Sequence, residues 1–294
     1  MNFKRAGIDD KKCVDLILKS SPCPTFEYNF ATVFLWQQPY DLQFAIEDDM
    51  LYVSSFEGEK SFLLPCGHGD FKTAVDKLID YANTRGFGAN FYSVTESQKE
   101  FLEKEYPGQF LFYDDRETAD YIYKSESLIS LKGKKLASKR NHINRFLSEN
   151  PDWCYEDITE NNINEVSKMH DKWCERADYS KDGLKNEGET VRNAIKYFRE
   201  LEFTGGLIRC GGEVIAFSMG EELNKNTYLI HFEKAFYDIS GAYQMINREF
   251  AYHNCTGYEF INREDDNGDE GLRNSKLSYR PYEILKKYYV KQKY

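Results

Sequence analysis

The residues of this chain best suited to chemistry lie between Tyr258 and Pro281, in the stretch YEFINREDDNGDEGLRNSKLSYRP. Its first residues alternate as in a short strand, and charged residues then crowd the strand's carboxyl end. Because sites in α/β sheets tend to lie beyond strand carboxyl ends, the pattern predicts a site there, with a solvated loop as the alternative. The candidate residues are Asn262, Arg263, Arg273, Lys276 and Tyr279, which all lie at this strand end or in the glycine-containing loop expected after it.

A second group of candidates is the basic run LKGKKLASKRNHINR, residues 131–145. No acidic residue occurs between Glu126 and Glu149, although the chain as a whole carries a net charge of −10. The run favours recognition of phosphate in a tRNA backbone, a lipid headgroup or a nucleotide, and a solvated helix face is the alternative. The candidate binding residues are Lys135, Lys139, Arg140 and Asn144.

Residues 227–234 predict a strand that places His231 and Glu233 on the same face. Glu233 lies near the carboxyl end, where a carboxylate could accept a proton from an attacking amine. A structural ion pair of Glu233 with Lys234 or Arg263 is the alternative interpretation. His231 fits a hydrogen-bonded interior histidine better than a catalytic one, and it stays a candidate for substrate contact.

Two arginines are expected to be buried against carboxylates. Arg140 interrupts the apolar stripe of a predicted helix, and Arg263 shares a strand face with Ile261. Because an unpaired buried guanidinium is costly, acids such as Glu233 or Glu264 should lie beside them.

Gly241 begins a predicted helix, where backbone N–H groups could reach a phosphate such as the pyrophosphate of CoA. The surrounding FYDISGAYQ lacks the leading Gln or Arg and the final small residue of the Q/R-x-x-G-x-G/A pattern. Asp238 would also repel a pyrophosphate. Gly241 is therefore a weak candidate for cofactor binding, and CoA is a less favoured cofactor.

The composition limits the classes of protein to consider. The chain has 294 residues, 41% of them hydrophobic, which suffices for one large core or two medium ones. Its seven cysteines are scattered without a C-x-x-C pair, so we expect free thiols, no metal site and a cytoplasmic location. The sequence shows neither a signal peptide nor an apolar run long enough to span a membrane. It indicates no oligomeric state.

The two halves of the chain share one order of predicted elements: helix, helix, hairpin, strand, helix, strand. The first half includes a hairpin around Asp48 and Asp49 and a helix at 71–84, and the second includes a hairpin around Gly211 and Gly212. We therefore expect a duplicated α/β (α+β) fold. The expected division is an N-terminal domain at 1–118, a basic linking segment and helix at 119–150, and a C-terminal domain at 151–294.

The stretch FINREDDNGDEGLRNSKLSYRP resembles a signature of the phosphatidylglycerol lysyltransferase C-terminal domain family. Three further stretches, which begin NFATVFLWQQ, DYIYKSESLI and GEVIAFSMGE, resemble the same family in the same order. The resemblance implies two tandem GNAT-type acyltransferase domains, each a mixed twisted sheet flanked by helices. It also implies a relation to the Fem-type enzymes, which take amino acids from aminoacyl-tRNA.

The activity that this resemblance implies is transfer of an aminoacyl group from aminoacyl-tRNA to an amine or hydroxyl acceptor. Glu233 would take the proton of the acceptor, and Arg263, Lys276 or Tyr279 would hold a phosphate or the ester carbonyl. The basic run would contact the tRNA or a phosphorylated or lipid-headgroup substrate. The alternatives are a CoA-dependent N-acyltransferase and a non-catalytic module that binds anions on the same fold.

Overall fold

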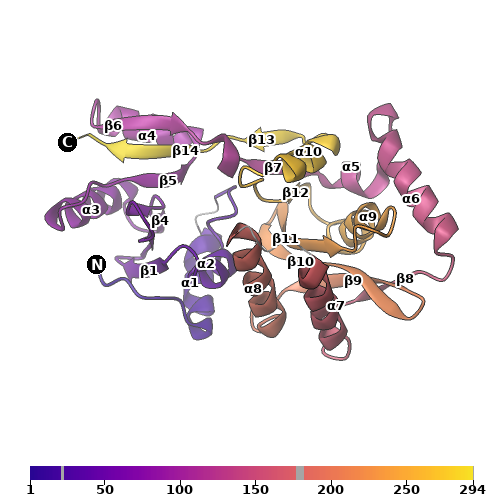
Figure 1. The fold of residues 1–294 in the computed structure, drawn as a ribbon. Helices are drawn as coiled ribbons and strands as arrows, with labels where there is room; N and C mark the ends of the chain where they lie inside the picture. The colour runs from indigo at the N-terminus through magenta and orange to yellow at the C-terminus, as the bar shows by residue number, and fades with distance from the viewer. Residues whose placement is uncertain (21–22, 177–181, 294) are drawn as a thin grey trace. The chain divides into compact units, whose positions relative to one another are not determined.

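A computed structural model of the chain describes residues 1–20, 23–176 and 182–293, whose fold is drawn in Figure 1. The chain divides into two compact units, and each is built around a mixed sheet. Unit 1 consists of Met1–Asp120, Asp265–Gly268 and Ile284–Tyr294, and unit 2 consists of Tyr121–Glu264 and Asp269–Glu283.

Unit 1 places its helices and strands in the order that the periodicities predict. The helices are α1 (Lys11–Ser20), α2 (Phe30–Trp36), α3 (Phe71–Thr84) and α4 (Glu96–Glu105), with the 3₁₀ turns η1 (Ile8–Asp10) and η2 (Arg116–Thr118). The strands are β1 (Leu42–Glu47), β2 (Met50–Ser55), β3 (Ser61–Phe62), β4 (Cys66–Gly67), β5 (Phe91–Val94), β6 (Phe110–Asp114) and β14 (Tyr288–Gln292). The predicted hairpin is confirmed as β1 and β2, where Asp48 and Asp49 adopt positive φ angles of 51° and 57°.

The sheet of unit 1 is completed by a strand from the far end of the sequence. Its order is β1-β2-β3-β5-β14-β6, with β3 and β5 parallel and β14 antiparallel to both neighbours. In Figure 1 the yellow β14 lies among strands from the first half of the chain. The expected division at 118, 150 and 294 therefore differs from the observed units. Residues 284–294 belong to unit 1, and the basic segment belongs to unit 2.

A buried charge cluster lies where β14 enters unit 1. The Lys287 ammonium is fully buried and contacts Asp120 Oδ1 at 2.5 Å and Glu27 Oε1 at 2.6 Å. Ser93 donates to the same Glu27 oxygen at 2.5 Å, and the amide of Phe26 donates to Asp120 Oδ2 at 3.1 Å. Burial alone would lower the pKa of Lys287, but the carboxylates of Asp120 and Glu27 raise it well above its usual value. These residues therefore tie the last strand to the N-terminal sheet.

Unit 2 repeats the plan with more helix. Its helices are α5 (Ser125–Ser130), α6 (Ala137–Glu149), α7 (Ile163–Arg176), α8 (Asp182–Lys196), α9 (Ala242–Asn254) and α10 (Glu270–Ser278), with the 3₁₀ turn η3 (Lys134–Leu136). Its strands are β7 (Asp120–Lys124), β8 (Cys154–Asp157), β9 (Thr204–Cys210), β10 (Glu213–Asn224), β11 (Thr227–Ala235), β12 (Phe260–Asn262) and β13 (Glu283–Leu285). The first residue of β7 and the last two of β13 are counted in unit 1. The β9–β10 hairpin turns at Gly211 and Gly212, which have the positive φ angles that such a turn requires.

The sheet of unit 2 opens between two parallel strands. Its order is β13-β7-β12-β11-β10-β9-β8. From β7 to β8 along this order, β11 and β12 are parallel, and each of the other neighbouring pairs is antiparallel. The parallel ladder ends at Leu229 and Asn262, whereas β11 continues to Ala235. We call this opening the splay. An antiparallel run followed by one parallel pair is the GNAT-type arrangement, and unit 1 repeats it at β3 and β5, so the predicted fold class is confirmed.

Neighbouring residues of β11 point to opposite faces of this sheet. Glu233 accepts a hydrogen bond from Asn247 of α9, and Lys234 forms an ion pair with Glu187 of α8. Lys234 also lies over the Trp173 ring of α7, so α9 covers one face of the sheet, and α7 and α8 lie on the other, as Figure 1 also shows.

The region after Gly268 is not the loop that the sequence predicts. Residues Glu270–Ser278 form α10, whose N-terminus is capped by Asp269, because its carboxylate accepts the amide of Leu272 at 2.7 Å. Gly271 in the first turn costs a helix only about 1 kcal/mol, which the cap offsets.

Candidate functional site

The predicted residues Glu233 and Arg263 meet at the splay. Arg263 follows the last residue of β12, and its Nη2 donates to Glu233 Oε1 at 3.0 Å. Both side chains are about nine-tenths buried, with 9% and 11% of their surface exposed. This pair confirms the expected acid partner of Arg263, and it brings together two residues that are far apart in the sequence.

A lysine and a tyrosine complete the arrangement. The Lys139 Nζ of α6 lies 4.0 Å from the centroid of the Tyr279 ring, and the Arg263 guanidinium lies 5.1 Å from the same centroid. Burial, with the nearby Glu233 charge, raises the pKa of Tyr279, so its hydroxyl keeps its proton at neutral pH. Both Lys139 and Tyr279 belong to the residues that the sequence singled out.

Asn247 is a member that sequence reasoning missed. It is fully buried in α9, and its Nδ2 donates to Glu233 Oε2 at 2.8 Å. A polar residue inside an otherwise apolar helix stripe was the available signal, because such a residue needs a buried partner. We call Lys139, Glu233, Asn247, Arg263 and Tyr279 the splay cluster.

Lys276 supports this cluster from α10. Its buried Nζ donates to the backbone carbonyl of Arg263 at 2.6 Å, and its own carbonyl accepts the Tyr123 hydroxyl at 2.8 Å. Asn262 is buried too, and its Oδ1 accepts the amide of Glu264 at 2.7 Å. These contacts fix the backbone that presents the Arg263 side chain.

His231 is held between two carboxylates. Its Nδ1 lies 2.8 Å from Glu264 Oε1, and its Nε2 lies 3.0 Å from Glu221 Oε1. Burial alone would lower the pKa of the imidazolium, but the hydrogen bonds to Glu221 and Glu264 raise it to about 9. His231 is therefore a charged interior histidine that bridges β10, β11 and the turn after β12.

This bridge predicts a stability that depends on pH. Because the pKa of His231 is raised on folding, its contribution is fully present below the unfolded value of about 6.5 and is lost as the pH rises through about 9. The urea midpoint of the natural chain should therefore fall between pH 6.5 and 9 relative to that of His231→Gln. Parallel midpoints for the two proteins across this range would contradict the assignment.

The other candidate residues of the basic run, Lys135, Arg140 and Asn144, are not members of the splay cluster. Arg140 is half-buried, and its Nη1 donates to the carbonyls of Leu131 and Gly133, the latter at 2.8 Å. The prediction of a carboxylate beside Arg140 is therefore wrong, since backbone carbonyls of the preceding turn accept its hydrogen bonds. Lys135 and Asn144 are exposed.

Gly241 and Arg273 complete the predicted set. Gly241 caps the N-terminus of α9 with a φ of 82°, and a Cβ there would lie 2.3 Å from the carbonyl oxygen of His142 in α6. Close packing of two helices therefore explains this glycine. Arg273 is half-buried on α10.

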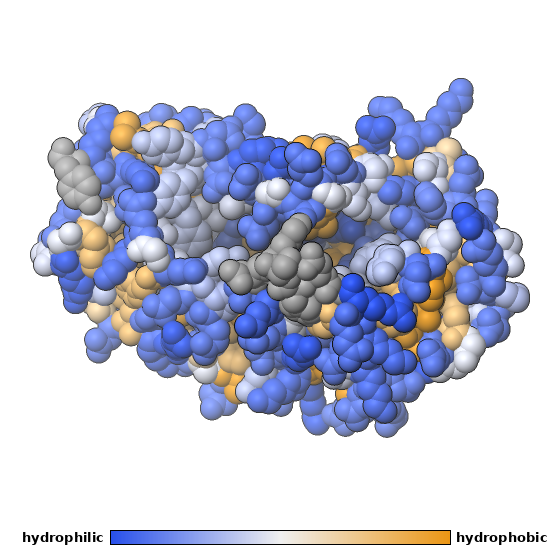
Figure 2. All heavy atoms as spheres, in the orientation of Figure 1, coloured by the Kyte–Doolittle hydropathy of each residue, from blue (hydrophilic) through white to orange (hydrophobic). Residues whose placement is uncertain are grey.

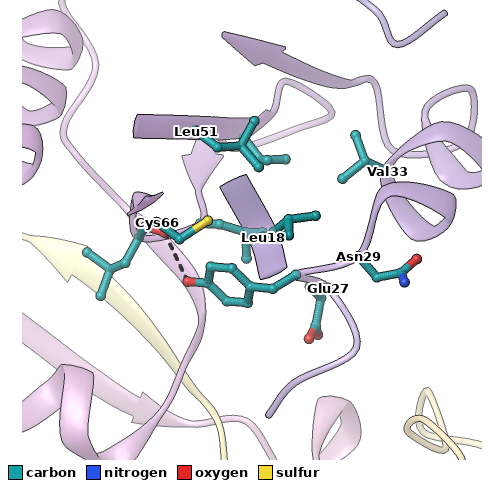
Figure 3. Close-up of a pocket in the computed structure, with 10 residues that line it drawn as sticks. Leu18, Glu27, Asn29, Val33, Leu51 and Cys66 are labelled. Atoms are coloured by element: carbon teal, nitrogen blue, oxygen red, sulfur yellow. Dashed lines mark hydrogen bonds between the residues drawn. The ribbon is translucent and has the colours of Figure 1, made fainter. Parts of the chain in front are cut away.

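A small pocket in unit 1 holds none of the predicted site residues. Its lining is mainly apolar, and Figure 3 shows Val33 and Leu51 on one side of it and the Glu27 carboxylate pointing away from them. Tyr28, which also lines it, donates to the Leu64 carbonyl at 3.0 Å.

Two features are relevant to contact with a membrane: the polarity of the surface, and the length and apolarity of the helices. Hydrophilic side chains cover most of the face shown in Figure 2, with apolar residues between them. No helix in the ranges that the structure describes combines the length and the apolarity needed to cross a bilayer.

A family model for the C-terminal part of phosphatidylglycerol lysyltransferase matches residues 21–291. The chain belongs to this family. The match takes in both units and the whole splay cluster. Family membership agrees with the resemblance in the sequence.

Three solved structures are similar to this family member along nearly all of its length. A conserved protein of unknown function from Bacteroides thetaiotaomicron is 38% identical, with both chains fully covered and a TM-score of 0.94. The C-terminal domain of a protein assigned as a lysylphosphatidylglycerol synthetase of Agrobacterium fabrum is 15% identical, with 97% and 92% covered and a TM-score of 0.70. L-PGS from Bacillus licheniformis is 16% identical, with 98% and 93% covered and a TM-score of 0.68. The last two likenesses establish the fold.

One curated protein is also similar to this chain. It is an uncharacterised protein of Mycoplasmoides gallisepticum, 24% identical over 210 aligned positions, and the alignment covers 67% of this chain and 63% of the relative. The chain thus spans less than two thirds of the length of this relative.

Proposed function

We propose that this protein transfers an aminoacyl group from an aminoacyl-tRNA to an amine or hydroxyl acceptor, and that the transfer takes place at the splay cluster. Family membership supports the reaction class. The observation that carries the proposal is the charge at the splay. Lys139 and Arg263 both lie against the Tyr279 ring, and Glu233 is the one acid that forms an ion pair with either of them in the described part of the chain.

An excess of positive charge suits this reaction. Attack on the donor ester develops negative charge on its carbonyl oxygen, and preorganised cations and hydrogen-bond donors stabilise that charge in a site shielded from water. Arg263 would supply the charge, and the protonated Tyr279 hydroxyl would supply a hydrogen bond. Glu233 and Asn247 would hold Arg263 in place.

The surrounding basic residues would bind the phosphates of the donor or acceptor. Lys135 is exposed, Arg273 lies on α10, and no acid interrupts residues 127–148. Aminoacyl-tRNA is favoured over CoA as the donor, because the turn at Gly241 is packed against α6. His231 and Asn262 would position the turn after β12 without touching the substrate.

The test is transfer of a radiolabelled amino acid. The purified chain would be incubated with aminoacyl-tRNAs of several amino acids and with phosphatidylglycerol vesicles or small amines as acceptors. We expect label to move to one acceptor with the natural chain and to stay on the tRNA with Arg263→Met. Transfer only from acetyl-CoA would replace the proposal by the CoA alternative, and binding of tRNA without transfer would favour a non-catalytic module.

A further inference from the structure

Lys139 is the charged member of the splay cluster that forms no ion pair within the described part of the chain. Its Nζ lies against the Tyr279 ring and makes no hydrogen bond or ion pair with another residue in the described ranges. Of the other cations nearby, Arg263 is paired with Glu233 through its Nη2, and Lys276 donates to a backbone carbonyl. A half-buried amine without a partner has its hydrogen-bonding positions available to a ligand.

The surroundings of Lys139 lower the pKa of its ammonium group. Burial is the largest effect, the Arg263 charge from the end of β12 adds to it, and the Glu233 carboxylate on β11 opposes both. Together they lower the pKa of Lys139 to about 8. About a tenth of its amine is then neutral at pH 7, against about one part in 3,000 for an ordinary lysine. The face of Tyr279, at the end of α10, is uncharged at this pH.

Glu233, by contrast, is fully engaged. Its Oε1 accepts from Arg263 and its Oε2 accepts from Asn247. Protonation of this carboxylate would remove an acceptor from one of these buried donors, which is costly. Glu233 is therefore better suited to position Arg263 than to take a proton from a substrate.

We propose that Lys139, as the neutral amine, accepts the proton of the attacking hydroxyl or amine. This inference rests on the proposed aminoacyl transfer. The acceptor oxygen or nitrogen bonds to the ester carbonyl carbon of the donor while its proton moves to Nζ of Lys139. The ester C–O bond then breaks, and the Lys139 ammonium returns the proton to the leaving oxygen. No electrons are gained or lost overall.

The first test reads the amine itself and needs no turnover. The chain would be labelled with trace amounts of an amine-selective acylating reagent between pH 6 and 11, and modification of each lysine would be measured by mass spectrometry. We expect the labelling of Lys139 to be half-maximal near pH 8, well below the pH of about 10.4 at which an ordinary lysine is half-deprotonated. Half-maximal labelling of Lys139 above pH 10, as for an ordinary lysine, would overturn the inference.

The second test separates a base from a fixed positive charge. Lys139→Arg keeps the charge, but a guanidinium does not accept a proton in this pH range. A positioned base contributes about 10²–10⁴-fold, so Lys139→Arg and Lys139→Met should both lose turnover by such a factor, while Lys168→Met, which changes an exposed lysine on α7, keeps it. Turnover by the natural chain should rise through pH 8, and this rise should persist in Glu233→Gln and vanish in Lys139→Arg.

The outcomes distinguish the two proposals. If Lys139→Arg is as active as the natural chain, or if Glu233→Gln rather than Lys139→Arg removes the rise with pH, Lys139 is not the base although the transfer occurs. If the natural chain turns over no aminoacyl-tRNA, the proposed function fails, and with it the role of Lys139 as its base. The labelling result would still report whether Lys139 carries an ordinary amine.

Discussion

Replacing Lys287 by methionine should lower the free energy of unfolding by about 3–5 kcal/mol, the usual cost of breaking a buried ion pair from one side. The variant would leave Asp120, which is fully buried, and Glu27, whose side chain is 12% exposed, without their shared counter-ion. Because Lys287 directly precedes β14, the loss should also loosen the last strand. Urea unfolding and amide hydrogen exchange of Tyr288–Gln292 would measure both effects.

The neighbouring residue gives a matched control. Lys286 is 65% exposed and lies 3.8 Å from Asp114, which is itself 55% exposed. Because such surface pairs contribute about 0–1 kcal/mol, Lys286→Met should hardly change the unfolding curve. Equal losses in Lys286→Met and Lys287→Met would show that the buried cluster does not anchor β14.

Removing either partner of the Arg263–Glu233 pair should destabilise the chain by about 3–5 kcal/mol, because each change leaves a buried charge unpaired. The double variant Arg263→Met, Glu233→Met should cost less than the sum of the single changes, since it removes both charges. We expect a coupling energy of about 1–3 kcal/mol from urea unfolding of the four proteins in the cycle.

An exposed pair in the same unit serves as the comparison. Arg199 and Glu160 lie 2.8 Å apart with side chains 82% and 76% exposed, so the same cycle there should give about 0.2–1 kcal/mol. If the effects at Arg263 and Glu233 simply add, the ion pair does not hold the splay cluster together. The assignment of Glu233 as a positioning residue would then lose its basis.

The sequence alone determined those parts of the fold that depend on local patterns. The helix at Phe71–Thr84 has the predicted bounds because an apolar stripe, an Asp70 cap and a following glycine all act within one segment. The two hairpins were predictable because their turn residues tolerate positive φ. The meeting of Glu233 with Arg263 followed from the GNAT-type order of strands, which places their carboxyl ends side by side.

Tertiary structure decided what depends on partners distant in the sequence. The short strands β7 and β14 carry no local signal for their neighbours, so neither the place of β14 in unit 1 nor the domain boundaries could be read from the pattern. The acceptors of Arg140 are backbone carbonyls, which no side-chain pattern reveals. The pKa of Lys139 is lowered by burial and by the charge of Arg263. Both causes exist only once α6 packs beside the strand ends, so the sequence pattern does not reveal them.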